Sequence, residues 1–271
     1  MKKKVSLFLV VCMTVLLAAC GKGNSRTFTV GFDAEFPPYG YMDDNGDYVG
    51  FDLDLAAEVC KRNGWELVKR PIDWDSKDME LSSGSIDCIW NGFTMNGRED
   101  QYTWSSPYVD NSQVFVVPAD SGITTFADLA GTAVGVQRDS SALSALNDEE
   151  TPENIALRDN FGLLTEYADY NIAFMDLEAG ALDAVAMDIG VAEYQIESRN
   201  GGYVILEQRL ATEQYGVGFL LGNEELRDTV EATLKDMAED GTFTKIAEEW
   251  GLADSPGCCF LTSLPLHWIP S

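Results

Sequence analysis

Short segments rich in β-forming residues alternate with segments of helical period along most of this chain, and this alternation constrains the fold more than any other feature. Amphipathic helices are expected after Gly50, after Asn223 and from Thr242. Such alternation is typical of α/β proteins, in which helices connect largely parallel strands. The expected strands cover residues 27–32, 66–69, 86–90, 114–117, 133–136, 184–187, 203–206 and 215–221.

Two short patterns occur twice. Residues 81–87 (LSSGSID) and 177–183 (LEAGALD) both read as a helix end, a glycine, Ile or Leu, and an aspartate before a buried strand. Residues 30–33 (VGFD) are echoed by residues 134–137 (VGVQ). We interpret these echoes as two similar lobes, in which Gly92 corresponds to Asp188. Because ligands of α/β sheets bind beyond the carboxyl ends of strands, the residues after these strands are expected to face a shared cleft.

The N-terminal segment is typical of a bacterial lipoprotein signal. Lysines at positions 2–4 precede an apolar run over residues 5–18, and small residues stand before Cys20. This pattern predicts removal of residues 1–19, acylation of Cys20 by a lipid such as palmitate, and a tether over residues 20–26. A plain signal peptide or a membrane-spanning helix is the alternative, but the run is shorter than the roughly 20 residues that span a bilayer. We therefore expect a chain anchored by lipid outside the cytoplasm.

Charge and composition exclude several classes of function. The chain has 45 acidic against 18 basic residues, a formal net charge of −27, so nucleic acid is not expected as a partner. Its single histidine is His267, near the end of the chain, which argues against histidine-based metal sites and catalytic triads. No cofactor or metal is expected. Cys60 and Cys88 fall in apolar segments and are expected in the core.

Four stretches resemble the polar amino-acid-binding lipoproteins of ABC importers, solute-binding protein family 3, which have the type II periplasmic-binding-protein fold. They are residues 31–39 (GFDAEFPPY), 50–56 (GFDLDLA), 87–108 (DCIWNGFT through WSSPY) and 215–219 (YGVGF) with the two final helices. The resemblance covers residues 27–252. It implies two lobes, each a mixed, mainly parallel sheet flanked by helices, with two hinge crossings. The first lobe would hold residues 27–109 and 215–252, and the second residues 114–210.

The resemblance also implies a non-catalytic receptor that traps a polar L-amino acid between its lobes. A zwitterion loses water at both charges when the lobes close, so each charge needs a partner. The resemblance implies that Arg98 binds the carboxylate through its guanidinium and that Asp188 binds the ammonium. The expected donors and acceptors around these two charges are Gly92, Thr94, Ser140 and Ser141.

The walls around the ligand side chain are expected to include Asp33, Phe36, Trp74 and Gln137. Asp33 beside two aromatic rings suits arginine or lysine, whereas Asp33 together with Gln137 suits glutamine. We therefore favour a basic or amide side chain. The receptor is expected to be a monomer that delivers its ligand to an ABC permease driven by a cytoplasmic ATPase.

Read without the family, the same residues have ordinary structural interpretations. Arg98 lies in a hydrophilic loop, where most arginines are exposed, and its distance from Thr94 is one residue shorter than is usual in the family. Asp188 could be a helix N-cap, Asp33 could cap a turn, and Phe36 and Trp74 could be core residues.

Two other functions and the end of the chain stay open. A cyclohexadienyl-dehydratase-like enzyme on the same scaffold would use a cleft acid, for which Glu35 and Glu166 are the candidates. A sensory module would need a following membrane or signalling segment. Residues 253–271 fit no regular pattern and are expected to be a disordered extension, with a Cys258–Cys259 disulfide, an interaction tail or a shifted reading frame as alternatives.

Overall fold

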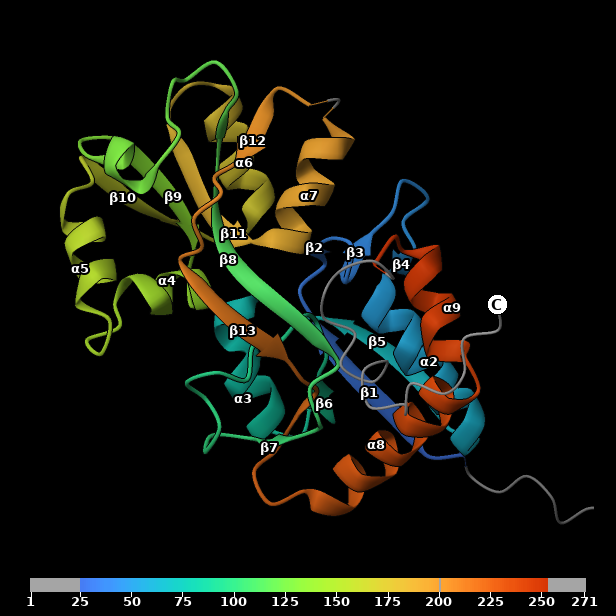
Figure 1. The fold of residues 1–271 in the computed structure, drawn as a ribbon. Helices are drawn as coiled ribbons and strands as arrows, with labels where there is room; N and C mark the ends of the chain where they lie inside the picture. Colours follow the sequence, from blue (N-terminus) through green and yellow to red (C-terminus); the bar gives the residue numbers. More distant parts are fainter. Residues whose placement is uncertain (1–24, 200, 253–271) are drawn as a thin grey trace, which may run out of the picture.

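The computed structural model describes residues 25–199 and 201–252. Two lobes lie side by side, and a pair of long strands runs between them (Figure 1). The expected signal segment, the lipid site at Cys20, most of the tether and the extension at residues 253–271 lie outside the described residues. Within the described part, no helix is both long and apolar enough to cross a membrane.

The first lobe is built on a five-stranded sheet with the order β5-β1-β6-β14-β7. Its strands are β1 (Thr27–Phe32), β5 (Glu66–Pro71), β6 (Cys88–Ile89), β7 (Thr103–Trp104) and β14 (Gly218–Phe219). The first three are parallel, and β14 is antiparallel to both of its neighbours. A small sheet at one side consists of β2 (Glu35–Phe36), β3 (Gly40–Met42) and β4 (Tyr48–Val49).

Helices from both ends of the described chain complete the first lobe, as the blue and red helices show (Figure 1). They are α2 (Phe51–Asn63), α3 (Lys77–Ser82), α8 (Glu224–Glu239) and α9 (Thr242–Glu249), with the short 3-10 helix η1 (Trp74–Ser76) before α3. The apolar stripe expected on α8 is buried at Leu226, Val230, Leu234 and Met237. Cys60 and Cys88 are free thiols in the core, as expected.

The second lobe is built on a sheet with the order β10-β9-β11-β8-β12, to which β13 adds beside β8. Strands β9, β10 and β11 are parallel, and β8 is antiparallel to β11. The strands are β8 (Val109–Pro118), β9 (Ala133–Gln137), β10 (Leu163–Tyr167), β11 (Ala184–Asp188), β12 (Tyr203–Ile205) and β13 (Ala211–Tyr215). The helices are η2 (Phe126–Leu129), α4 (Ser141–Leu146), α5 (Pro152–Asp159), α6 (Tyr170–Glu178) and α7 (Ile189–Ser198). The expected α/β fold of two mixed sheets is confirmed.

Strands β8 and β13 form the antiparallel connection between the lobes, with Val109 opposite Tyr215. The expectation of one strand over residues 215–221 is wrong, because Tyr215 ends β13 and only residues 218–219 form β14. The chain changes partners in between: Gly216 N donates to Phe93 O at 3.0 Å, and Val217 N donates to Ser105 Oγ at 2.9 Å. The strand is interrupted here because β13 pairs with β8 in one sheet and β14 pairs with β6 and β7 in the other.

The sequence repeat is present in the hydrogen bonding of both lobes. Thr29 N donates to Asp87 Oδ2 at 2.7 Å in the first lobe, and Ala133 N donates to Asp183 Oδ2 at 2.8 Å in the second. Each aspartate directly precedes a central strand, and its side chain accepts a hydrogen bond from a backbone N–H early in the neighbouring strand. The two echoed segments form the same structural unit.

The packing repeats as well. A Cβ atom added at Gly31 would lie 2.4 Å from Ile86 Cδ1, and one added at Gly135 would lie 2.6 Å from Leu182 Cδ1. Both distances are shorter than nonbonded carbon atoms tolerate, so a strand glycine makes room for the large side chain that precedes each aspartate.

We predict that Asp87→Ala and Asp183→Ala each lower the free energy of unfolding by about 0.5–1.5 kcal/mol, because each change removes the side-chain acceptor of a backbone N–H. Urea unfolding followed by circular dichroism measures the loss. Asp44→Ala, in an exposed turn, is the control and should change stability little. If Asp87→Ala and Asp183→Ala unfold with the same free energy as Asp44→Ala, the proposed structural role of the repeat is wrong.

Candidate functional site

A narrow cavity lies between the lobes, at the carboxyl ends of the central strands. Nine of the ten residues expected at a ligand site line it, and Asn91 is an additional wall residue. Asp33 is the expected residue that does not line this cavity. The lining residues are Phe36, Trp74, Asn91, Gly92, Thr94, Arg98, Gln137, Ser140, Ser141 and Asp188.

Both lobes contribute through the loops that follow their strands. Gly92, Thr94 and Arg98 follow β6. Gln137 is the last residue of β9, and Ser140 and Ser141 come after it at the start of α4. Asp188 is the last residue of β11, directly before α7. The repeat that aligned Gly92 with Asp188 therefore places one residue from each lobe on the wall of a single cavity.

Arg98 lies close to its own loop and has no salt-bridge partner among the described residues. Its Nη1 donates to Thr94 O at 3.2 Å, and its guanidinium carbon is 5.4 Å from the centre of the Phe93 ring. Gly97 has a φ of +77°, a conformation that glycine adopts easily, and this allows the short connection from Thr94. The guanidinium is thus available for an anion in the cavity.

Asp188 is buried, with 4% of its surface exposed. Its Oδ1 accepts hydrogen bonds from Asn111 Nδ2 and Gln113 Nε2 at 2.7 Å and from Tyr215 OH at 2.6 Å. Although Asp188 stands at the N-cap position of α7, its side chain makes no capping hydrogen bond. Burial and the nearby charge of Glu213 raise the pKa of Asp188 to about 7. Among the described residues, the hydrogen-bond donors to this carboxylate are amide and hydroxyl groups and none is a cation.

Glu213, on β13, is a site residue that the sequence analysis missed. It is 5% exposed, and its Oε1 accepts a hydrogen bond from Thr94 Oγ1 at 2.8 Å. Ser141 Oγ donates to its other oxygen, Oε2. The available signal was its place in a hinge crossing, where Glu213 shares the inward face of the strand with Tyr215 while Gln214 is exposed.

Asp33 and Gln137 meet across the gap between the lobes. Gln137 Nε2 donates to Asp33 Oδ2 at 2.7 Å, and Glu35 N donates to Asp33 Oδ1 at 2.9 Å. Asp33 thus also bonds its own turn, and burial raises the pKa of its carboxyl to about 6. These two residues occupy corresponding positions in the sequence repeat.

The aromatic residues of the wall also pack against other rings. Phe36 is 6% exposed, and its ring centre is 6.1 Å from that of Tyr170. Trp74 meets Phe93 edge to face, with 5.4 Å between the ring centres. Both aromatic side chains therefore contribute to packing and to the cavity wall.

Asp52 holds the loop that carries Gly92. Its Oδ2 accepts hydrogen bonds from Gly92 N at 2.6 Å and from Tyr108 OH at 2.8 Å, while Oδ1 has no partner among the described residues. Complete burial raises the pKa of Asp52 to about 7. Asp52 therefore fixes part of the cavity wall.

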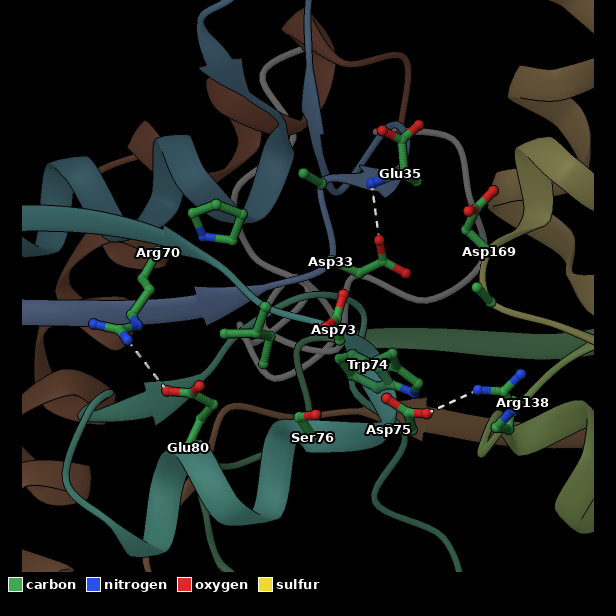
Figure 2. Close-up of a pocket in the computed structure, with 14 residues that line it drawn as sticks. Asp33, Glu35, Arg70, Asp73, Trp74, Asp75, Ser76, Glu80, Arg138 and Asp169 are labelled. Atoms are coloured by element: carbon green, nitrogen blue, oxygen red, sulfur yellow. Dashed lines mark hydrogen bonds and ion pairs between the residues drawn. The ribbon is translucent and has the colours of Figure 1, made fainter.

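A larger pocket of about 620 Å³ lies next to this cavity and shares Trp74 with it (Figure 2). Asp33 also lines it, and acidic side chains surround it. Both arginines of this pocket are paired: Arg138 with Asp75 at 3.0 Å and Arg70 with Glu80 at 3.5 Å. An anion would have to displace these partners, whereas Arg98 has none, so the narrow cavity is the better candidate site.

The lobes are closed around the narrow cavity, which measures about 20 Å³. This is room for about one water molecule. Two ion pairs also join the lobes, Lys77 with Asp139 and Arg138 with Asp75. An amino acid could enter only if the lobes separated.

The match to known proteins agrees with this geometry. Residues 28–253 match the family described as bacterial extracellular solute-binding proteins, family 3. The chain belongs to this family, whose members among the matching proteins are amino-acid-binding proteins of ABC transporters.

Three relatives illustrate the range of named ligands. The L-cystine-binding protein TcyJ of Escherichia coli is 29% identical over 231 residues, 84% of each chain. The arginine-binding extracellular protein ArtP of Bacillus subtilis is 28% identical over 260 residues, 92% of this chain and 98% of ArtP. A Streptococcus pneumoniae ABC transporter substrate-binding protein with bound histidine has a TM-score of 0.80 and 33% identity, covering 84% of this chain and 94% of that one.

The raised pKa of Asp52 predicts a pH-dependent stability. A carboxyl whose pKa is higher in the folded than in the unfolded state stabilises the fold fully at low pH and loses this contribution as pH rises through the folded value. The melting temperature of the ligand-free protein should therefore fall between pH 5 and pH 8. In Asp52→Asn this fall should be smaller by several degrees, since one kcal/mol corresponds to roughly 2–4 °C.

Calorimetric scans at pH 5, 6, 7 and 8 measure the fall. Asp44→Asn, in an exposed turn, should keep the wild-type slope. An unchanged slope in Asp52→Asn would show that Asp52 does not titrate in this range.

Proposed function

We propose that this protein captures a polar L-amino acid, with a basic or amide side chain favoured, and delivers it to an ABC import permease. One observation carries the proposal: Arg98 and Asp188, from different lobes, line the same cavity. A zwitterion held there would place its carboxylate at the guanidinium and its ammonium at the carboxylate. The ligand would then bridge both lobes, which favours the closed conformation.

The proposed side-chain preference rests on Asp33 and Gln137, which lie at the boundary between the cavity and the acidic outer pocket. A cationic side chain could replace the amide of Gln137 as the partner of Asp33, and Trp74 borders both spaces. The names of the arginine- and histidine-binding relatives agree with this preference, whereas the cystine-binding relative shows that the family accepts other side chains.

The proposal includes a lipid anchor at Cys20 and a position outside the cytoplasm. Its support is the sequence of residues 1–20, in which a basic start, an apolar run and small residues precede the cysteine. The monomeric receptor would diffuse at the membrane surface and meet its permease and ATPase there.

Binding is favoured over catalysis because the two candidate acids of a dehydratase do not line the cavity. Glu35 lines the outer pocket and accepts a hydrogen bond from Asn171. Glu166 is exposed on β10. Neither carboxyl is placed to donate a proton to a molecule held between Arg98 and Asp188.

Arg98→Ala should weaken amino-acid binding at least about 30-fold, because loss of one member of a buried charge pair costs about 2–5 kcal/mol. A thermal-shift screen of the twenty amino acids with ornithine and cystine selects the ligand, and titration calorimetry measures its affinity. Arg70→Ala removes an arginine of the outer pocket and should bind normally. Equal affinities of wild type and Arg98→Ala would refute the carboxylate assignment.

Asp33→Asn should change the ligand preference. Loss of the carboxylate should weaken the binding of arginine or lysine about tenfold or more, since a hydrogen bond to a charged group contributes about 1.5–3 kcal/mol. The affinity for glutamine should change much less. Parallel titrations with arginine and glutamine measure the ratio of affinities. If the ratio is the same as in wild type, Asp33 does not contact the ligand side chain.

A further inference from the structure

Asp188 and Glu213 form a buried pair of carboxylates joined by shared donors. Asn111 Nδ2 lies 2.7 Å from both Asp188 Oδ1 and Glu213 Oε1. Gln113 Nε2 lies 2.7 Å from the same two oxygens. Two like charges are thus held close together away from water, which is unfavourable unless a proton or a cation accompanies them.

None of the hydrogen-bond partners of this pair among the described residues is a lysine or an arginine. The groups that hydrogen-bond to it are Thr94 from the loop after β6, Asn111 and Gln113 from β8, Ser141 from α4, Tyr170 from α6 and Tyr215 from β13. The charged residues Glu193 and Arg209 line a separate pocket that Glu213 also borders. Arg98, across the cavity, is the cation that lines the same space. Asn111 Oδ1 and Gln113 Oε1 are buried without partners in the described structure, so this region has more acceptors than donors.

Glu213 determines the orientation of two hydroxyl groups in the cavity wall. Thr94 and Ser141 both line the cavity, and both donate their single hydroxyl hydrogen to Glu213. With these hydrogens engaged, the two oxygens offer only lone pairs to a ligand. In this arrangement the Thr94 hydroxyl can accept a hydrogen bond from a ligand ammonium. It cannot also donate one to a ligand carboxylate.

We propose that Glu213 is a positioning residue of the ammonium subsite, which turns the Thr94 and Ser141 hydroxyls into acceptors and adds its negative charge behind Asp188. The inference rests on the proposed function. According to this inference, the end of the ligand beside β13 is a primary ammonium group. Its three N–H groups would donate to the Asp188 carboxylate, the Thr94 hydroxyl and the Gly92 carbonyl. An uncharged or anionic group at this end is disfavoured.

The pair also links binding to protons. Without a ligand, the raised pKa of Asp188, about 7, means that the pair retains a proton over part of the neutral range. A bound ammonium supplies the positive charge instead, so the proton leaves to solvent as the ligand enters. Affinity should therefore rise from pH 6 to pH 8 in the wild type.

The test compares wild type with Glu213→Gln, which keeps the shape and one acceptor oxygen but removes the charge. The probes are L-arginine and L-glutamine, each with its counterpart that lacks the α-ammonium, δ-guanidinovalerate and glutaramate. Calorimetry at pH 6, 7 and 8, in two buffers of different ionisation enthalpy, gives affinity and proton release. Glu193→Gln, an exposed acid on α7, is the matched control.

Glu213→Gln should lower the affinity for the amino acid about tenfold at pH 8 and by less at pH 6. Binding to this variant should release fewer protons. The affinity for the ammonium-free counterpart should change less than about twofold. Equal weakening of both compounds at every pH would mean a merely structural role and would overturn the inference. If wild type binds an amino acid and the variant binds it equally well, the inference fails while the proposed function stands. If wild type binds no amino acid, the proposed function itself fails.

Discussion

A carboxylate that is removed from water needs a proton or a cation, and the centre of this protein buries two carboxylates within reach of the same amide donors. The surrounding fold supplies hydroxyl and amide groups to Asp188 and Glu213 but no cation from β8, β13, α4 or α6. The positive charge has to come from a proton or from a ligand. This electrostatic requirement is the physical basis of the ammonium position that we propose, and Arg98 on the opposite wall of the cavity is the basis of the proposed carboxylate position.

The repeated unit predicted part of the site, the correspondence of Gly92 with Asp188 and of Asp33 with Gln137. The resemblance to the family supplied the other expected residues, which are Phe36, Trp74, Thr94, Arg98, Ser140 and Ser141. Asp87 and Asp183 make equivalent hydrogen bonds, and this equivalence places Gly92 and Asp188 at the same cavity. The positions of most core strands and of the helices α2, α8 and α9 were predictable from apolar period and glycine position. Strand lengths were not, because residues 114–117 were expected where β8 covers Val109–Pro118, and residues 86–90 where β6 covers Cys88–Ile89. The function of the site residues is a separate question, which the binding experiments address.

The residues that were missed take their importance from contacts distant in sequence. Glu213 lies 119 positions from Thr94 and 72 from Ser141, and no local pattern encodes those hydrogen bonds. Asp52 lies 40 positions from Gly92, which it holds in place. The break between β13 and β14 likewise depends on Phe93 and Ser105, which belong to another part of the chain. Local periodicity carries no information about such partners.

The small volume of the closed cavity has a kinetic consequence. Because the space between the lobes is about 20 Å³, a captured molecule would have no exit path along which it could diffuse while the protein stayed shut. Its residence time would equal the waiting time for the lobes to part, and contacts that bridge both lobes would lengthen that time. A membrane partner that binds both lobes in their separated arrangement could then release the ligand faster than spontaneous opening does.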